Sequence, residues 1–330
     1  MSTDRFEEYG WHKIEADASE VDRLSREIGV STLIARIIAN RGILETNEAQ
    51  KFLEPSLADM YDPFALPDME KGADRIAAAI KTNQTILVHG DYDIDGVTST
   101  AVLVRTLEKL GGRVKCKVPH RRKDGYDIKP KAIEDAHKDG VKLVVTCDCG
   151  TSALESTRAA SALGIDMVIT DHHEPGKILP NALAVVNPKR IDSSYPFSEL
   201  AGVGVALKMA QAVAMILKQN PESVLKAYLD LAALGTVGDV APLIKENRAI
   251  VKHGLNAFAT SKKIGLQTAI KHTGYIGKAI TPYYVGFVLG PRMNAVGRMD
   301  DAALSLQLLL TKDPEEAEKI VLEMEEHNIN

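Results

Sequence analysis

The sequence has little cysteine and no long apolar run. Its three cysteines, Cys116, Cys147 and Cys149, are too few for a disulfide framework, which favours a reducing environment. No basic start leads into an apolar stretch, as it does in a signal peptide. No apolar run approaches the roughly 20 residues that a membrane-spanning helix needs. These absences predict a cytoplasmic protein without a membrane segment.

Two common catalytic motifs are also missing. The sequence contains no GxSxG motif, which would present a serine nucleophile, and no Walker-type GxxxxGKS loop. Gly202-Val203-Gly204 has the start of a dinucleotide-binding loop, but it follows Leu200-Ala201 rather than a clear strand. Close packing of a helix against a sheet accounts better for these glycines.

Positive charge is in deficit overall, yet it is concentrated locally. The net charge of −5 does not by itself favour a protein that binds nucleic acid. The stretch from residue 113 to 131 has only two acidic residues, Asp124 and Asp127. It has eight basic residues, which are Arg113, Lys115, Lys117, Arg121, Arg122, Lys123, Lys129 and Lys131. This stretch is a candidate surface for an anion. The alternative is a solvated sheet edge that lysines protect.

The order of apolar and helical stretches predicts an α/β protein. With 330 residues and 45% hydrophobic residues, the chain can form one large domain with an appended segment, or two smaller lobes. After mostly helical residues up to about 80, apolar runs at 85–88, 114–118, 143–146, 167–170 and 182–186 alternate with helices at 97–110, 131–138 and 153–163. This alternation predicts a parallel β-sheet flanked by helices, and a largely helical part follows Glu199.

Further helices are expected on both sides of the sheet-forming region. They are predicted over 19–28, 31–40, 47–52 (capped by Thr46), 69–81, 201–218, 222–234, 247–259, 283–289, 302–310 and 314–327. We expect a helical amino-terminal segment (1–70), a catalytic domain (71–312) and the start of a connecting helix (313–330). Because the last helix is uncapped near Asn330, the chain is expected to be cut rather than finished.

Polar side chains follow three of the predicted strands. Asp91, Asp93 and Asp95 come after the first, with His89 at its end; Cys147-Asp148-Cys149 follows the third, and Asp171-His172-His173 the fourth. Were the first strand's extended path to continue, alternation would place its three aspartates on one face, where they repel one another. Carboxyl ends of parallel strands form ligand sites, so three such ends indicate a metal site.

The ligand types narrow the choice of metal. Carboxylates with a minority of histidines suit Mn²⁺ or Mg²⁺ better than structural zinc, although Zn²⁺ or Co²⁺ also fits. Ligation by Cys147 and Cys149 is an alternative, but small buried residues are favoured for both. Asp239 lies in the apolar stretch GTVGDVAPL and needs a partner, either a metal or a helix end.

The motifs together resemble a known family. HGDYDIDG, VTCDCG, TDHHEPG and GTVGDVAPL resemble, in that order, the four motifs of the DHH phosphoesterase superfamily. PHRRKDGYDI, ELAGVGVALK and GPRMNAVGRMDDA narrow the resemblance to the bacterial RecJ exonucleases, from roughly residue 70 onward. This resemblance implies a 5′-to-3′ exonuclease that hydrolyses single-stranded DNA by a two-metal mechanism in recombination and repair. Helicase and single-strand-binding protein are the partners it implies.

The resemblance also implies roles for individual residues. The two divalent cations, normally Mn²⁺, would be held by His89, Asp93, Asp95, Asp148, His172 and Asp239. Asp148 would bridge them, and His173 would lie near the scissile phosphate or orient a ligand. Arg292 would contact that phosphate and Arg121 a nucleotide phosphate. Tyr126, Asn294 and Arg298 complete the expected nucleic-acid contacts, with residues 292–298 expected in a connection between helices.

Departures from the family pattern and competing functions remain open. Asp127 stands where glycine is usual, and a carboxylate pointing at the phosphate path would weaken binding. Gly238 stands where alanine is usual, with little expected effect, and Asp91 either orients His89 or caps a backbone.

Competing functions are a DHH phosphoesterase for small substrates and a non-catalytic DNA-binding scaffold; the intact motifs favour the exonuclease.

Overall fold

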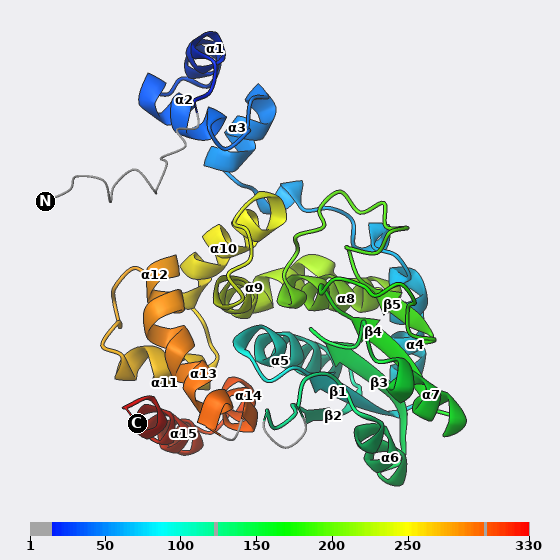
Figure 1. Ribbon diagram of the computed structural model, residues 1–330. Coiled ribbons are helices and arrows are strands. Elements are labelled where there is room, and N and C mark those ends of the chain that lie inside the picture. Colours follow the sequence, from blue (N-terminus) through cyan, green and yellow to red (C-terminus); the bar gives the residue numbers. More distant parts are fainter. Residues whose placement is uncertain (1–14, 122–124, 300–301, 330) are drawn as a thin grey trace, which may run out of the picture. The chain divides into compact units, whose positions relative to one another are not determined.

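The computed structural model describes residues 15–121, 125–299 and 302–329, and it divides into two compact units (Figure 1). The first unit ends at Ser56 and the second begins at Leu57. The functional boundaries expected at residues 70 and 312 are a different division of the chain and stay a prediction.

The first unit contains three short helices, α1 (Ala18–Ile28), α2 (Thr32–Ala39) and α3 (Thr46–Leu53). Their small core consists of Val21, Leu24, Ala35, Ile38, Ala39 and Ala49. The expected cap of the third helix is wrong by one residue: Glu45 holds the N-cap position, and the hydroxyl of Thr46 instead donates to the carboxylate of Glu27.

The second unit is built on a parallel sheet of five strands. The strands are β1 (Thr85–Gly90), β2 (Arg113–Lys117), β3 (Val141–Cys147), β4 (Asp166–Thr170) and β5 (Ala184–Val186), in the order β2-β1-β3-β4-β5. This confirms the predicted α/β class. The order of strands reverses between β1 and β3, which is where open parallel sheets form ligand sites.

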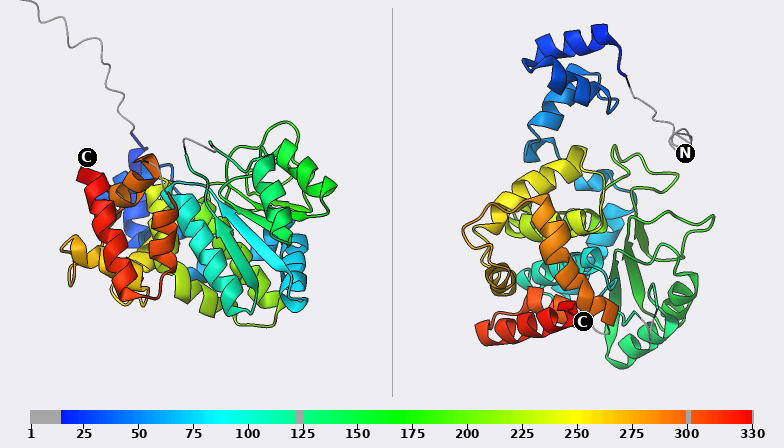
Figure 2. Two further views of the ribbon diagram at one scale, coloured as in Figure 1. Left: turned by 90° about the horizontal axis from the view of Figure 1, so that it is seen from below. Right: turned by 60° about the vertical axis from the view of Figure 1, so that its left-hand side comes forward.

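Helices cover both faces of this sheet. Helices α4 (Met69–Lys81), α5 (Ile94–Lys109) and α8 (Gly202–Ile216) lie on one face, and α6 (Pro130–Lys138) and α7 (Leu154–Ala162) on the other, so that Figure 2 (left) shows the sheet between two helical layers. Side chains alternate between the layers: Ile86 and Val88 belong to the larger core and Leu87 to the smaller one. Both faces are therefore buried, which explains the continuous apolar runs of the strands.

The remainder of the second unit is helical, as predicted. Beyond the short η1 (Leu57–Asp59) and η2 (Pro63–Ala65), it comprises α9 (Pro221–Gly238), α10 (Lys245–Phe258), α11 (Ile264–His272), α12 (Pro282–Tyr284), the π-helical η3 (Val285–Leu289), α13 (Gly290–Met299), α14 (Ala302–Leu310) and α15 (Pro314–Ile329). Helix α9 packs against α5, α8 and α10. Among the described residues, no helix has the length and apolar character to cross a membrane.

Two of these helices differ from the sequence prediction. Helix α11 was not expected, because Gly265 weakens the helical pattern; a Cβ there would lie 1.7 Å from the carbonyl oxygen of Leu308, so the glycine serves close packing. The connection expected around Arg292 is helix α13. Pro291 lacks an N–H and crowds the preceding turn, and the chain accommodates it by a π-helical turn immediately before it, rather than by ending the helix.

Two buried ion pairs lie in the helical part. The Nζ of Lys208 lies 2.7 Å from a carboxylate oxygen of Glu246, and both side chains are 1% exposed. Glu246 also accepts from the hydroxyl of Tyr195 at 2.6 Å and from the backbone N–H of Tyr61 at 3.0 Å. Lys263 and Asp230 form a similar pair at 2.7 Å. Each buried carboxylate here has a lysine of its own.

Candidate metal centre

The sheet register aligns three aspartates in one row. Gly90, Cys147, Thr170 and Val186 are paired at the ends of β1, β3, β4 and β5. One residue further on, the backbone N–H of Asp91 donates to Cys147 at 3.2 Å, that of Asp148 to Thr170 at 2.9 Å and that of Asp171 to Val186 at 3.1 Å. Asp91, Asp148 and Asp171 therefore lie side by side at the carboxyl edge of the sheet, where the strand order reverses.

The path after β1 turns instead of staying extended. Helix α5 begins at Ile94 because the carboxylate of Asp93 caps it, accepting from the backbone N–H groups of Asp95 and Gly96 at 3.0 Å each. A Cβ on Gly96 would lie 2.5 Å from the carbonyl oxygen of Asp91, so the turn requires a glycine there. The prediction that Asp91, Asp93 and Asp95 share one face of an extended strand is therefore wrong, because the chain turns into a helix between Asp91 and Asp95.

Asp95 is fully buried against the start of α8. Its two carboxylate oxygens accept from the backbone N–H groups of Gly202 and Val203, both at 2.8 Å. The helix N-terminus stabilises this negative charge. A Cβ on Gly202 would lie 2.5 Å from Oδ1 of Asp148. The glycine therefore allows the start of α8 to pack directly against this metal-capable aspartate, in line with the close packing expected for the glycines of this stretch.

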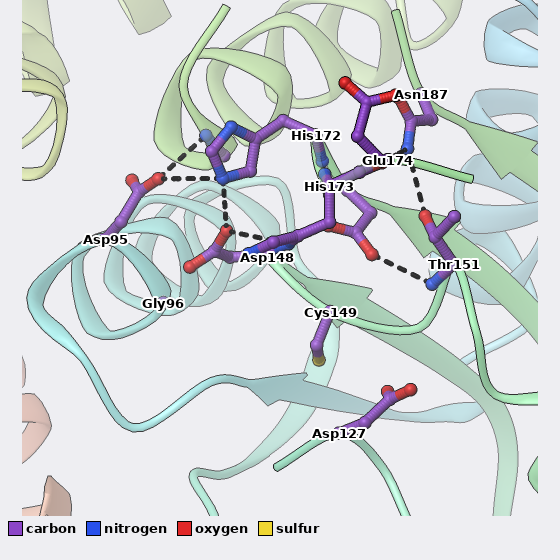
Figure 3. Close-up of polar contacts among 12 residues, drawn as sticks. Asp95, Gly96, Asp127, Asp148, Cys149, Thr151, His172, His173, Glu174 and Asn187 are labelled. Atoms are coloured by element: carbon purple, nitrogen blue, oxygen red, sulfur yellow. Dashed lines mark hydrogen bonds and ion pairs between the residues drawn. The ribbon is translucent and has the colours of Figure 1, made fainter. Parts of the chain in front are cut away.

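His172 lies between two carboxylates, as Figure 3 shows. Its Nε2 is 3.0 Å from Oδ1 of Asp148 and 3.8 Å from Oδ2 of Asp95. Burial, with a further contribution from His173, lowers the pKa of His172 to about 4, so its imidazole is neutral at pH 7. A neutral imidazole does not balance the charge of the aspartates, and it is the form that binds a metal.

Asp239 occupies the C-cap position of α9. The alternative of a helix cap as the partner of this charge is therefore wrong, because Asp239 lies at the carboxyl end of the helix. A carboxylate at the negative end of a helix is unfavourable without a cation. Burial and the nearby Asp93 raise the pKa of Asp239 to about 6, which fits a group that needs such a partner.

Asp171 holds His173 in place, a role that the sequence analysis did not assign. It accepts from Nδ1 of His173 at 2.7 Å and from the backbone N–H groups of His172 at 2.8 Å and Thr151 at 2.8 Å. Burial alone would raise the pKa of Asp171, but the hydrogen bonds from His173 and Thr151 outweigh it and lower the pKa. The bond to Asp171 raises the pKa of His173 and leaves its Nε2 for another ligand. The feature of the sequence that could have predicted this role is the position of Asp171 directly after a strand.

Candidate ligand atoms converge in three groups, within each of which they lie within 4.8 Å of one another. The groups are Asp148, His172 and His173; Asp95, His172 and Asp239; and Asp91, Asp93 and Asp148. Asp148 and His172 each belong to two groups. Such shared ligands are what two neighbouring cations require.

The donor atoms fit divalent cations. Oδ1 of Asp91, Oδ1 of Asp148 and Nε2 of His172 are buried and have no hydrogen-bond partner in the described structure. Burial and neighbouring carboxylates raise the pKa of Asp91 to about 7 and those of Asp95 and Asp148 well above their ordinary values. A cation placed among these oxygens satisfies the unpartnered atoms and offsets the repulsion that raises these pKa values.

The structure treats His89 and the cysteines differently from these residues. His89 is buried at the end of β1 but is absent from the three groups in the described part of the chain. No cysteine belongs to a group among the same residues, and Figure 3 shows the Cys149 side chain directed away from Asp148. Burial raises the pKa of Cys149, which favours the interpretation as a small buried residue over a thiolate ligand.

The residues expected to bind nucleic acid do not form one cluster in the described structure, and each has its own contacts. The guanidinium of Arg121 lies 5.2 Å from the ring centroid of Tyr92, and the Tyr126 ring lies 5.7 Å from that of His173. Arg292, on α13, pairs with Glu325 at 2.6 Å. Asn294 is partly buried on the same helix. The side chain of Arg298 lies outside the described part, and the roles expected for all five stay predictions.

The structure shows the surroundings of Asp127 and Gly238, the two residues that depart from the family pattern. Asp127 has a left-handed backbone (φ 70°), and its carboxylate accepts from the N–H of Ile128 at 2.8 Å. Figure 3 shows it apart from the cluster of Asp95, Asp148 and His172. The expectation that Gly238 matters little does not fit its surroundings, since a Cβ there would lie 2.2 Å from Cγ2 of the buried Ile94.

Comparison with known proteins identifies the class to which this fold and site belong. The model of the DHH family, N-terminal domain, matches residues 85–236. The matched range contains the whole parallel sheet and, except for Asp239, every member of the three ligand groups. The structure is thus that of a DHH protein with an acidic, histidine-containing edge to its sheet.

Three relatives define the family more closely. The chain is 41% identical to the single-stranded-DNA-specific exonuclease RecJ of Bacillus subtilis over 96% of this chain and 40% of that protein. A structure of RecJ with Mn²⁺ from Thermus thermophilus matches with a TM-score of 0.82 at 31% identity, over 96% of this chain and 45% of that one, and the protein has also been solved with Mg²⁺. A structure of exonuclease RecJ bound to manganese matches with a TM-score of 0.74 at 37% identity, over 82% and 68% of the two chains.

The chain belongs to the RecJ family. It spans 40% of the length of the Bacillus subtilis relative, so that relative has further regions with no counterpart in this chain.

Proposed function

We propose that this chain carries the catalytic centre of an exonuclease that hydrolyses phosphodiester bonds of single-stranded DNA in the 5′-to-3′ direction, with two divalent cations. The observation that carries the proposal is the sharing of Asp148 and His172 between groups of converging ligand atoms. Relatives of the chain are named as single-stranded-DNA-specific exonucleases, and solved relatives hold Mn²⁺ or Mg²⁺. Mn²⁺ is the cation we expect to be preferred, with Mg²⁺ as the alternative.

The proposed ligands are His89, Asp93, Asp95, Asp148, His172 and Asp239, and the geometry adds Asp91. Two cations in this position acidify a water molecule and stabilise the charge that develops on the phosphate. Asp148 lies between the groups, and α8 holds Asp95 rigidly through two backbone N–H groups. Asp171 keeps Nδ1 of His173 occupied, so Nε2 of His173 is the atom that can meet the phosphate or a cation.

Phosphate contacts beyond the metal centre are assigned to basic side chains. Arg121 and Arg292 suit this role because a guanidinium holds two phosphate oxygens at once. Arg292 must exchange its ion pair with Glu325 for the substrate. Asn294, Arg298 and Tyr126 are proposed as further contacts. Tyr126 packs against His173, so a base stacked on it would lie next to the centre.

The biological setting belongs to the same proposal. Work in the cytoplasm, in recombination and repair with a helicase and a single-strand-binding protein, follows from the family resemblance.

The decisive experiment is Mn²⁺-dependent release of nucleotides from single-stranded oligonucleotides labelled at either the 5′ or the 3′ end. We expect early release of label from the 5′ end, no release from blunt duplex DNA and none without Mn²⁺. Asp148→Asn should abolish hydrolysis, because the substitution preserves shape but removes the shared negative charge.

Asp166→Asn is the matched control. Asp166 also lies in a strand of the sheet, but at the start of β4, and its partner is Arg75. This variant should keep the wild-type rate. Hydrolysis of dinucleotides but not of longer strands would favour a small-substrate phosphoesterase. Unchanged hydrolysis by Asp148→Asn would contradict the proposed centre.

A further inference from the structure

A second basic region of the sequence contains no acidic residue at all. From Asn247 to Met299 the chain has no Asp or Glu, and its basic residues there are Arg248, Lys252, Lys262, Lys263, Lys271, Lys278, Arg292 and Arg298. In a protein with a net charge of −5, the stretch itself is positive, although two of its basic residues pair with acids from elsewhere in the chain, Lys263 with Asp230 and Arg292 with Glu325. The stretch forms α10 to α13 and includes the π-helical η3.

Two large aromatic side chains are exposed in the middle of this stretch. Tyr283 is 64% exposed and Phe287 is 71% exposed. Their rings are stacked, with centroids 5.0 Å apart and planes 26° from parallel. Exposed aromatic rings that face solvent as a pair mark interaction surfaces more often than chance exposure.

The ring pair is supported from beneath by ordered contacts. Tyr284, between the two residues in sequence, is fully buried, and its hydroxyl lies 2.7 Å from Oγ1 of Thr273. The ring of Tyr284 lies 4.1 Å from that of Tyr275, over which the ammonium of Lys278 is placed at 4.9 Å. The turn that presents the exposed rings is therefore fixed, and a positive charge is held beside it.

The same turn packs against the helix that ends at the metal centre. In Figure 1, η3 connects α12 and α13, and it packs against α9. A Cβ on Gly286 would lie 4.0 Å from Val237, two residues before Asp239, and one on Gly290 would lie 3.8 Å from Ile94, between Asp93 and Asp95. Tyr283 and Phe287 lie on this same segment, which packs against α9 and leads into α13.

The rim between these elements carries another unusual residue. Val240, directly after Asp239, is 85% exposed and has a left-handed backbone with φ 61°. This conformation is costly for a β-branched residue, and such strain concentrates at functional sites. An apolar side chain is thus held in solvent directly beside a metal-capable aspartate.

We propose that Tyr283 and Phe287 form a stacking platform for bases of the single-stranded nucleic acid whose end enters the metal centre. The inference rests on the proposed function. Stacking on aromatic rings is tolerant of sequence, since every base presents a flat face. The acid-free segment around the platform attracts the phosphates, and the duplex form cannot use the platform because its bases are already stacked and paired.

The test measures binding apart from hydrolysis, with the whole chain in EDTA so that no cation is present. The probe is a fluorescein-labelled oligothymidylate, followed by anisotropy. Phe287→Ala should weaken binding about tenfold, because one base stack contributes roughly 1–3 kcal/mol. Ile191→Ala removes an apolar side chain that is even more exposed than that of Phe287, from the connection after β5, and should leave the affinity unchanged.

A conservative substitution at position 287 makes base stacking directly visible by fluorescence. Phe287→Trp should keep the affinity, and in a Trp11→Phe background, which removes the chain's single native tryptophan, its fluorescence should be quenched by the oligonucleotide. Quenching that saturates with the anisotropy supports the platform. Wild-type affinity in Phe287→Ala, no quenching in Phe287→Trp, or no binding by the wild-type chain would overturn it.

The hydrolysis assay separates this inference from the proposed function. With Mn²⁺, Phe287→Ala and Tyr283→Ala should raise KM for a long single strand several-fold and leave dinucleotide hydrolysis at the wild-type rate. Hydrolysis of the long strand with an unchanged KM would keep the exonuclease and reject the platform. Quenching and binding without any hydrolysis would keep the platform and reject the exonuclease.

Discussion

Buried carboxylates occur in two regions of the second unit, and the two regions neutralise them differently. In the helical part, Glu246 has Lys208 at 2.7 Å and Asp230 has Lys263 at 2.7 Å. At the carboxyl edge of the sheet, the described basic side chains within 4 Å of Asp148 are those of His172 and His173, and His172 is neutral at pH 7 because burial lowers its pKa to about 4.

The difference teaches how to recognise a site built for an external cation. A buried carboxylate with its own lysine is a finished structural element, although such a pair adds little net stability over apolar side chains. A buried carboxylate cluster whose central imidazole, that of His172, is neutral lacks a counter-charge, and the raised pKa values of Asp91 and Asp148 reflect that lack.

Glu246→Gln should lower the free energy of unfolding by about 3–5 kcal/mol, because it leaves the ammonium of Lys208 buried without a counter-charge. Urea unfolding followed by circular dichroism measures the loss. Combining it with Lys208→Met should recover part of the stability. A loss below about 1 kcal/mol would remove the distinction between the two regions.

Mn²⁺ should stabilise the wild-type chain by about 2.7 kcal/mol at a concentration of one hundred times its Kd, since it binds only the folded state. Asp148→Asn should abolish this gain and raise the Tm of the metal-free chain, because it relieves repulsion from Asp95 and Asp93. Thermal unfolding with and without Mn²⁺ gives both numbers. A lower metal-free Tm in Asp148→Asn would show that the cluster is balanced from within.

Gly238→Ala should cost about 1–3 kcal/mol, because the new methyl group meets the buried side chain of Ile94 next to two metal-capable aspartates. In the double variant with Ile94→Ala, the methyl group fills space that the smaller side chain leaves. The two costs should therefore be less than additive by at least about 0.5 kcal/mol in urea unfolding. Additive costs would mean that the two positions do not share this space.

The pH dependence of stability should reverse on metal binding. The pKa of Asp91 is raised to about 7 and that of Asp239 to about 6, so between pH 4 and these values the metal-free folded state holds more protons than the unfolded state. Stability that these groups contribute at low pH is therefore lost as pH rises through these two pKa values.

In excess Mn²⁺ the trend should be the opposite, because protons compete with the cation for the same oxygens. Melting curves at pH 5.0 to 7.5, with EDTA or with Mn²⁺, distinguish the two trends. Parallel curves in the two conditions would contradict the assignment of these carboxylates to the metal centre.

Much of this architecture follows from local patterns in the sequence. The five apolar runs predicted all five strands, and their alternation with helices predicted a parallel sheet, because only crossover helices connect such strands compactly. The strand-end residues Asp148 and His172 were candidate ligands for the same reason. Helix α11 and the helical state of Arg292 were not foreseen, since glycine and proline in those stretches weaken the helical pattern while close packing and a π-helical turn accommodate them.

The sequence by itself determined the class of fold, the edge of the sheet that carries the site and the chemical types of its ligands. These follow from apolar periodicity and from polar residues at strand ends, which are local properties. Only the tertiary structure decided that Asp91, Asp148 and Asp171 form one row, that α8 holds Asp95, and that the rings of Tyr283 and Phe287 stack. Strand register and helix packing bring together residues far apart in the chain, and no local pattern records that proximity.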